Sequence, residues 1–111
     1  MVWLGVILKE SLEDLSLLEL VKIVETKKER YNIEVEDNEK DEFVQKAIRS
    51  VKSKFYIHLV KNKLIYVIFR NHMFKFSRGY PELETAREYG KSIGIPKKQM
   101  PFEELIENPF G

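Results

Sequence analysis

The sequence predicts a single α+β domain over residues 1–111, with a mostly antiparallel sheet of about five strands and two main helices packed on it in a two-layer arrangement. The chain length of 111 residues is typical of one domain, and the apolar fraction of 43% is typical of a globular protein. Short runs of strand-forming residues alternate with two segments whose apolar residues recur at helical spacing. A chain of this size buries roughly two thirds of its unfolded surface, so it needs no disulfide or metal for stability.

The first third of the chain contains three expected strands and one ambiguous segment. Residues 2–8 are apolar on both faces, which predicts an interior strand. The leucines of residues 12–18 suit a helical face, and such a helix could run on to Val24. The β-branched residues of 20–26 favour a strand instead, so we expect a helical turn over 12–18 and a strand over 20–26. Residues 31–35 alternate between apolar and polar side chains, which predicts a half-buried strand.

The clearest helix follows Asp37. Asn38 is a suitable N-cap, and Asp41 stands three residues later, in the position of a capping box. The segment then shows one apolar stripe at helical spacing, formed by Phe43, Val44, Ala47, Ile48 and Val51.

Residues 55–77 read as three antiparallel strands, over 55–60, 63–70 and 73–77. Two-residue loops at Lys61-Asn62 and Asn71-His72 connect them, because asparagine tolerates the left-handed conformation of tight turns. In this register one face of the sheet carries the following side chains: Tyr56, His58, Ile65, Val67, Phe69, Phe74 and Phe76. It places on the other face Phe55, Ile57, Leu59, Leu64, Tyr66, Ile68 and Met73.

The last third predicts a helix from Pro81, which suits a first turn, to Gly94, which suits a helix end. Residues 101–106 predict one further short helical turn before an apolar tail.

Several of these segments resemble a group of small uncharacterised prokaryotic, largely archaeal, proteins. The shared features are the strand Phe55-Tyr-Ile-His58, the apolar strand Leu64–Phe69, the segment Met73-Phe-Lys-Phe76 and the ending Tyr89-Gly-Lys-Ser-Ile-Gly-Ile-Pro96. The likeness spans about residues 55–102, and Phe55 departs from it, since Trp is more usual there. The resemblance implies a shared fold and no activity.

The composition of the chain is rich in Lys and Glu, which is common in thermophile proteins.

The chain has no cysteine, which excludes a disulfide framework and thiolate chemistry. The apolar run at 2–8 lacks a preceding basic segment and is too short to span a bilayer. We therefore expect a cytoplasmic protein that does not enter a membrane.

Charge is distributed unevenly along the chain, although its net value is +1. Residues 1–42 carry twelve acidic and six basic side chains, whereas residues 43–81 carry nine basic side chains and no acidic one. This acid-free block also holds eight of the thirteen aromatic residues, a combination seen in proteins that bind single-stranded nucleic acid. The cations that would bind nucleic acid are Lys46, Arg49, Lys52, Lys61, Lys63, Arg70, Lys75 and Arg78. The alternative is that the aromatic residues are core and that acidic residues of other segments neutralise the cations.

Both faces of the predicted three-strand unit are apolar, and two helices cover only one face of a small sheet. The other face then needs cover from the N-terminal segment, the C-terminal tail or a second copy of the chain. A second copy would bind through Phe55, Ile57, Leu59, Leu64, Tyr66 and Ile68. A homodimer is therefore one expected assembly.

No residue pattern specifies a reaction. His58 lies among aromatic residues, where a buried histidine with a satisfied hydrogen bond is the favoured interpretation, and His72 should be exposed in a turn. Neither histidine has a partner at metal-ligand spacing, so we expect no metal and no cofactor. We therefore expect a non-enzymatic binding or interaction domain that self-associates, followed by a nucleic-acid-binding protein, with a small-molecule enzyme third.

Overall fold

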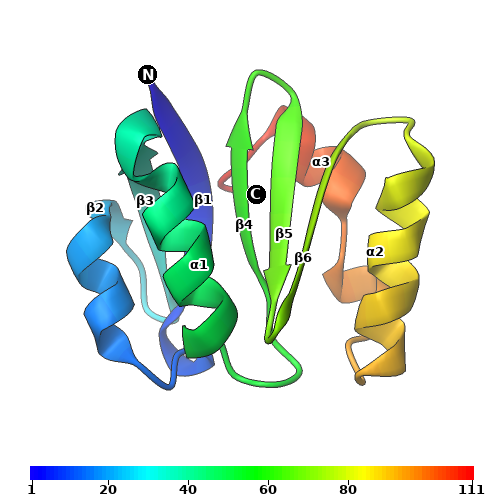
Figure 1. The fold of residues 1–111 in the computed structure, drawn as a ribbon, viewed down its shortest axis with the longest axis horizontal. Coiled ribbons are helices and arrows are strands. Elements are labelled where there is room, and N and C mark those ends of the chain that lie inside the picture. The colour runs from blue at the N-terminus through cyan, green and yellow to red at the C-terminus, as the bar shows by residue number, and fades with distance from the viewer.

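A computed structural model describes all residues 1–111 and contains one antiparallel sheet of six strands. The strand order across the sheet is β2-β3-β1-β4-β5-β6 (Figure 1). The strands are β1 (Val2–Leu8), β2 (Lys22–Thr26), β3 (Arg30–Glu36), β4 (Ile57–Lys61), β5 (Leu64–Phe69) and β6 (His72–Ser77). The α+β class and the antiparallel sheet are confirmed. The six strands correspond to the six segments expected to be strands, whereas the overall prediction was about five.

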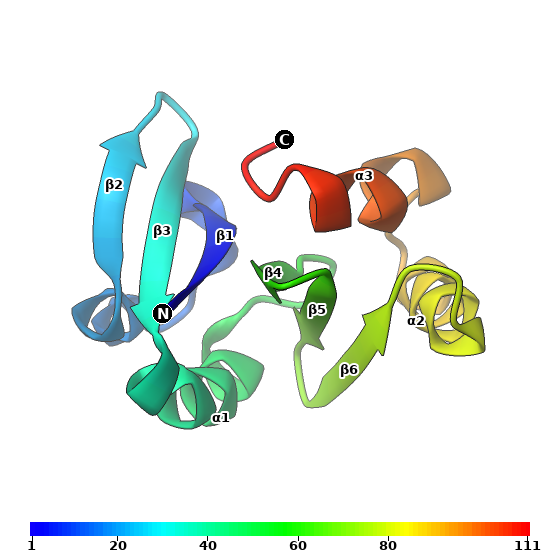
Figure 2. The same cartoon turned by 90° about the horizontal axis from the view of Figure 1, so that it is seen from above.

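Three α-helices lie against this sheet: α1 (Lys40–Ser50), α2 (Pro81–Ser92) and α3 (Phe102–Glu107). Four short 3-10 helices occupy Lys9–Ser11, Leu15–Leu20, Asp37–Glu39 and Lys97–Gln99. Figure 2 shows α1 on one side of the sheet and α3 with the C-terminal segment on the other. The helices are thus divided between the two faces and do not form the single second layer that the sequence suggested.

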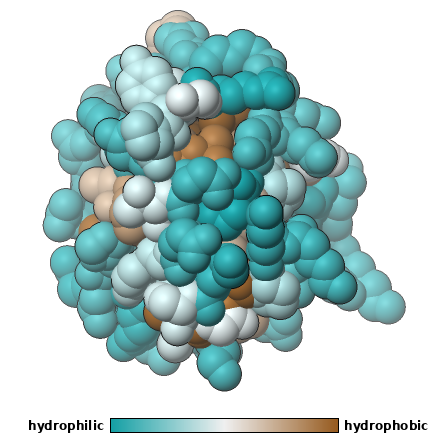
Figure 3. Space-filling model, turned by 90° about the vertical axis from the view of Figure 1, so that its right-hand side faces the viewer, coloured by the Kyte–Doolittle hydropathy of each residue, from teal (hydrophilic) through white to brown (hydrophobic).

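Each face of the sheet has its own hydrophobic cluster. Beneath α1, the helix stripe of Phe43, Val44 and Ala47 packs on inward side chains of β3, β1, β4 and β5. On the opposite face, Leu83 and Ala86 of α2 and Phe102 of α3 pack on side chains of β5 and β6. Viewed from the right-hand side of Figure 1, where α2 lies, the surface is mainly hydrophilic with small apolar areas (Figure 3). Because successive strand residues point to opposite faces, the central strands β4 and β5 supply buried side chains to both clusters.

The prediction of which side chains in residues 55–77 lie on the same face of the sheet is correct. Both loops, however, lie one residue away from the expected positions. The hairpin loops are Asn62-Lys63 and Arg70-Asn71, with Lys61 opposite Leu64 and Phe69 opposite His72. Asn62, Lys63 and Asn71 have positive φ, as such tight turns require. A shift of one residue in the loop moves the strand pairing by two residues, so every side chain keeps its face.

Two local predictions need correction. The segment expected to be a helical turn over 12–18 forms a 3-10 helix over Leu15–Leu20, and β2 begins only at Lys22. Asn38 does not cap α1, because the chain already turns helically from Asp37 and places Asn38 inside that first turn. The second main helix is confirmed, and it ends before Gly94, whose φ is +100°.

Candidate functional site

The face of the sheet opposite α1 is covered by helices only over its β5–β6 side, whereas the C-terminal segment covers β1 and β4. Two hydrogen bonds hold this segment. The Nε2 atom of His58 lies 2.6 Å from the carbonyl oxygen of Pro109, and Nη2 of Arg30 donates to the carbonyl oxygen of Phe110 at 2.7 Å. Backbone carbonyls, and not a packed helix, therefore attach this cover to the sheet.

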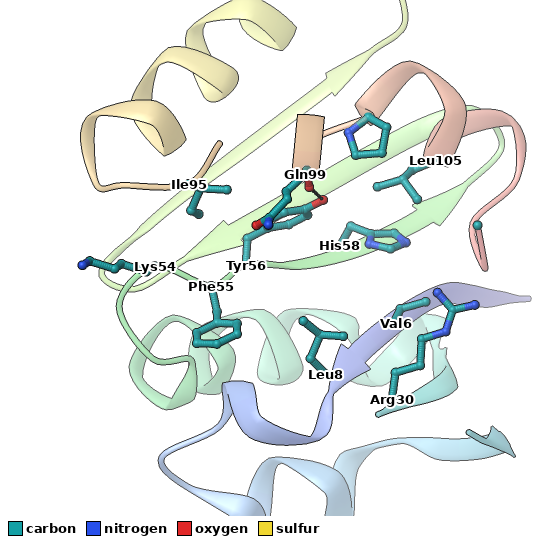
Figure 4. A pocket seen from close by; sticks show the side chains of 12 residues that line it. Val6, Leu8, Arg30, Lys54, Phe55, Tyr56, His58, Ile95, Gln99 and Leu105 are labelled. Carbon is teal, nitrogen blue, oxygen red and sulfur yellow. Dashed lines mark hydrogen bonds between the residues drawn. The ribbon is translucent and has the colours of Figure 1, made fainter. Parts of the chain in front are cut away.

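A cavity of about 300 Å³ lies between the C-terminal third of the chain and the β1–β4 strand pair (Figure 4). Its volume is at the lower end of the range of small-molecule sites. Its wall is formed by Val6, Leu8, Arg30, Lys54, Phe55, Tyr56, His58, Ile95, Gln99, Pro101, Leu105 and Gly111. The lining is largely apolar, and its only charged side chains are the cations Arg30 and Lys54.

His58 projects from β4 into this cavity wall and is only 5% exposed. Burial, with a smaller contribution from the nearby charge of Arg30, lowers the pKa of His58 to about 4. The ring is therefore neutral at physiological pH, and its Nε2–H donates to Pro109. A buried histidine with a satisfied hydrogen bond is the interpretation that the sequence favoured.

Tyr56 is also committed to the backbone, since its hydroxyl donates to the carbonyl oxygen of Gln99 at 2.7 Å. Burial raises the pKa of the Tyr56 phenol, so its hydroxyl keeps its proton. His58 and Tyr56 thus both serve as neutral hydrogen-bond donors to loop carbonyls. This arrangement suits binding better than acid–base chemistry by either group.

Neither Arg30 nor Lys54 forms an ion pair with a carboxylate. Arg30 is half-buried at the start of β3, directly opposite Leu8 on β1. Lys54 is exposed in the loop before β4, and its side chain runs over Gly94. Figure 4 shows them at opposite ends of the cavity.

The basic residues that the sequence proposed for nucleic-acid binding are divided by the fold. Four of the eight form ion pairs with acids outside the acid-free block: Lys61 with Asp37, Lys63 and Arg78 with Glu107, and Arg70 with Glu13. The remaining four, Lys46, Arg49, Lys52 and Lys75, form no ion pair. Their charge is available, but the expected patch of eight is reduced to half.

The apolar face that the sequence proposed for self-association is inside the protein. Ile57, Leu59 and Ile68 have no exposed surface, and Tyr66 retains only 7%. The same chain covers this face with α1, so it is not available to a second copy of the chain. No pattern in the sequence indicates that the two helices lie on opposite faces of the sheet.

Sequence reasoning missed the cavity, although it named His58. The cavity wall is formed by five separate stretches of chain, and only the fold brings Arg30 near Leu105.

No group of three or more His, Asp or Glu side chains is arranged to share a metal ion. No helix combines the length and the apolar character needed to cross a bilayer.

Comparisons with known proteins identify no relative of this chain. No protein-family model matches the chain, and searches of curated proteins and of solved structures give no significant match. The function is therefore argued from the cavity and the surfaces alone.

Proposed function

We propose that this chain is a non-enzymatic, cytoplasmic binding domain that holds a small ligand in the cavity between β1, β4 and the C-terminal segment. The observation that carries the proposal is a cavity of about 300 Å³ whose wall is mostly apolar and contains two cations without ion-pair partners. Apolar walls with a few directed polar groups are the usual composition of ligand sites.

The test is an NMR titration of the labelled protein with small neutral, anionic and cationic aromatic compounds of roughly ten non-hydrogen atoms, a size that the cavity volume accommodates. We expect at least one compound to shift the backbone amide signals of Leu8, His58 and Leu105. Leu8 is 36% exposed at the cavity wall, so Leu8→Trp should fill the cavity without unfolding the protein. Leu15→Trp, at a position 64% exposed and outside the cavity, is the matched control.

Two results would count against the proposal. The first is that no compound shifts these signals at millimolar concentration. The second is that Leu8→Trp binds the compounds as well as the Leu15→Trp control does.

A second candidate function is self-association through β2, at the edge of the sheet. All five residues of β2 are exposed, and Ile23 and Val24 retain 40% and 39% of their surface. An antiparallel pair of two β2 strands centred between these residues would place Lys22 of one copy beside Glu25 of the other, which are opposite charges. A register irregularity between Ile23 and Glu25 interrupts this edge and weakens it as a pairing surface.

Analytical ultracentrifugation tests this second candidate. A wild-type dimer that Ile23→Lys converts into a folded monomer would support it. A wild-type monomer at about 100 µM would remove it, because a dimer weaker than that has a standard free energy of only about −5 to −6 kcal/mol.

A further inference from the structure

The charged side chains at the cavity all have the same sign. Arg30 and Lys54 line it, and no acidic side chain does. This is notable in a chain with 18 acidic residues, whose other cations are in several cases paired with carboxylates. In an apolar surrounding, an unpaired cation attracts an anion more strongly than it would in water.

The other polar groups of the wall do not offset this charge. His58 is neutral, and its Nε2–H is bound to Pro109. The Tyr56 hydroxyl is bound to the Gln99 carbonyl. Two loop carbonyl oxygens that would favour a cation are thereby already occupied by donors.

Arg30 retains the means to bind an anion directly. Its guanidinium group has five N–H donors, and one hydrogen bond, to Phe110, is formed from it. The planar fork of the remaining donors matches a carboxylate. Leu8, the residue opposite Arg30, supplies apolar surface beside this fork.

Lys54 is held at the other end of the cavity by an unusual backbone conformation. Its φ of +71° lies in the left-handed region, which is unfavourable for a residue with a side chain. Lys54 adopts this conformation in the turn over residues 52–55, which is closed by a hydrogen bond of 3.2 Å from the Phe55 N–H to the Lys52 carbonyl oxygen. This turn accounts for the positive φ of Lys54, as the hairpin loops account for those of Asn62, Lys63 and Asn71.

We propose, resting on the binding function above, that the ligand is a small monoanion with a compact apolar body, such as an aryl-substituted or branched carboxylate. Its carboxylate group contacts Arg30, and its apolar body lies against Leu8, Phe55 and Leu105. Lys54 adds favourable charge at the opposite end, more weakly because its ammonium group is in solvent.

The test is isothermal titration calorimetry with three compounds of nearly equal shape and different charge: 3-phenylpropionate, 3-phenylpropanamide and 3-phenylpropylamine. We expect the carboxylate to bind at least roughly tenfold more tightly than the amide, as expected for a charge-assisted hydrogen bond. The ammonium compound should bind most weakly. Inorganic phosphate, an anion without an apolar body, should not compete with the carboxylate.

Two variants remove the cations with little change in structure. Arg30→Gln retains an N–H donor for Phe110 and should weaken carboxylate binding by roughly tenfold while leaving the amide within about twofold. Lys54→Gly relieves the left-handed backbone and should weaken carboxylate binding by roughly two- to threefold. Lys63→Gly is the matched control, because Lys63 also has a positive φ, of +66°, and lies outside this cavity.

The outcomes separate this inference from the proposed function. If the amide binds as tightly as the carboxylate, and Leu8→Trp blocks both, the binding function stands and the anionic ligand is wrong. If phosphate displaces the carboxylate, the site recognises the charge alone and the apolar body is wrong. If none of the three aromatic compounds binds, both proposals fail.

Discussion

The two faces of the sheet are closed in different ways. Under α1, apolar side chains from the helix and four strands meet directly, and Phe43, Ile33 and Ile57 among them have no exposed surface. On the other face, α2 and α3 close the β5–β6 side in the same manner, but the C-terminal segment closes the β1–β4 side through hydrogen bonds from His58 and Arg30. The first closure leaves no space, and the second leaves the cavity. We therefore expect the α1 face to contribute most to stability, while the ligand of the proposed function would bind on the opposite face.

The two faces should differ most in the free energy of unfolding that is lost when an aromatic side chain is truncated to alanine. Phe43, in α1, has no exposed surface, whereas Phe110, in the C-terminal segment, is only half-buried. We expect Phe43→Ala to lower the free energy of unfolding by about 3–5 kcal/mol, because it leaves a cavity in a tightly packed core. Phe110→Ala should cost about 1 kcal/mol. Urea unfolding monitored by circular dichroism measures both, and similar losses would show that the two closures are equivalent.

The sequence was sufficient to predict the core of the α1 face. The period of two in residues 55–77 and the helical period in residues 43–51 each require only a local pattern, so the loop errors of one residue did not change any face. The stripe positions Phe43, Val44, Ala47 and Val51 are buried as expected.

The cavity could not be predicted in the same way. Whether a helix covers one face or the other depends on how the chain crosses the sheet, and no local pattern encodes that choice. The attachment of the C-terminal segment depends on carbonyl groups, which every residue has. Arg30 and Lys54 therefore look like ordinary exposed charges in the sequence.

The next prediction uses His58 to test how firmly the C-terminal segment closes its face. Between pH 6.5 and about 4, the unfolded chain binds a proton at His58 while the folded protein does not. The free energy of unfolding should therefore fall as the pH is lowered through this range, by about 3 kcal/mol in total. His58→Gln retains a donor for Pro109 but does not titrate.

Urea unfolding at several pH values measures this effect. The wild-type protein should lose about 3 kcal/mol more than His58→Gln between pH 7 and pH 4. The comparison with the variant cancels the contribution of carboxyl groups such as Glu103, whose pKa is lowered by its hydrogen bond with Arg87. Parallel pH profiles would mean that the histidine is hydrated and that the segment covers it only loosely.

A smaller change in stability is expected where α2 packs against Met100, on the β5–β6 side of the face opposite α1. Gly90 is buried in α2, and an added Cβ there would overlap the sulfur atom of Met100. An exposed Gly→Ala change in a helix stabilises by about 1 kcal/mol, but overpacking costs about 1–3 kcal/mol. We expect Gly90→Ala to destabilise by about 1 kcal/mol, and Gly90→Ala combined with Met100→Val to recover part of the loss. Thermal unfolding measures both, and a rise in Tm for the single variant would show that α2 packs loosely there.

The smallest effect on stability is expected on the outer surface of the α1 side, which carries the cations that remain unpaired. Arg49 is exposed on α1, and Lys75 is exposed on β6, where its ammonium group lies 5.8 Å from the centre of the Tyr66 ring. Arg49→Glu/Lys75→Glu should change the free energy of unfolding by no more than about 0.5 kcal/mol, because neither residue forms an ion pair or fills the core.

The same double variant decides whether this surface binds nucleic acid. Since half of the predicted patch is neutralised by Asp37, Glu107 and Glu13, we expect no binding to single-stranded or duplex oligonucleotides tighter than about 100 µM at physiological salt. Fluorescence anisotropy over a range of salt concentrations measures it. Micromolar binding that weakens with salt and disappears in the double variant would show that the four unpaired cations are sufficient. In that case the α1 face would carry a second binding surface, and the division of stability and ligand access between the two faces would no longer hold.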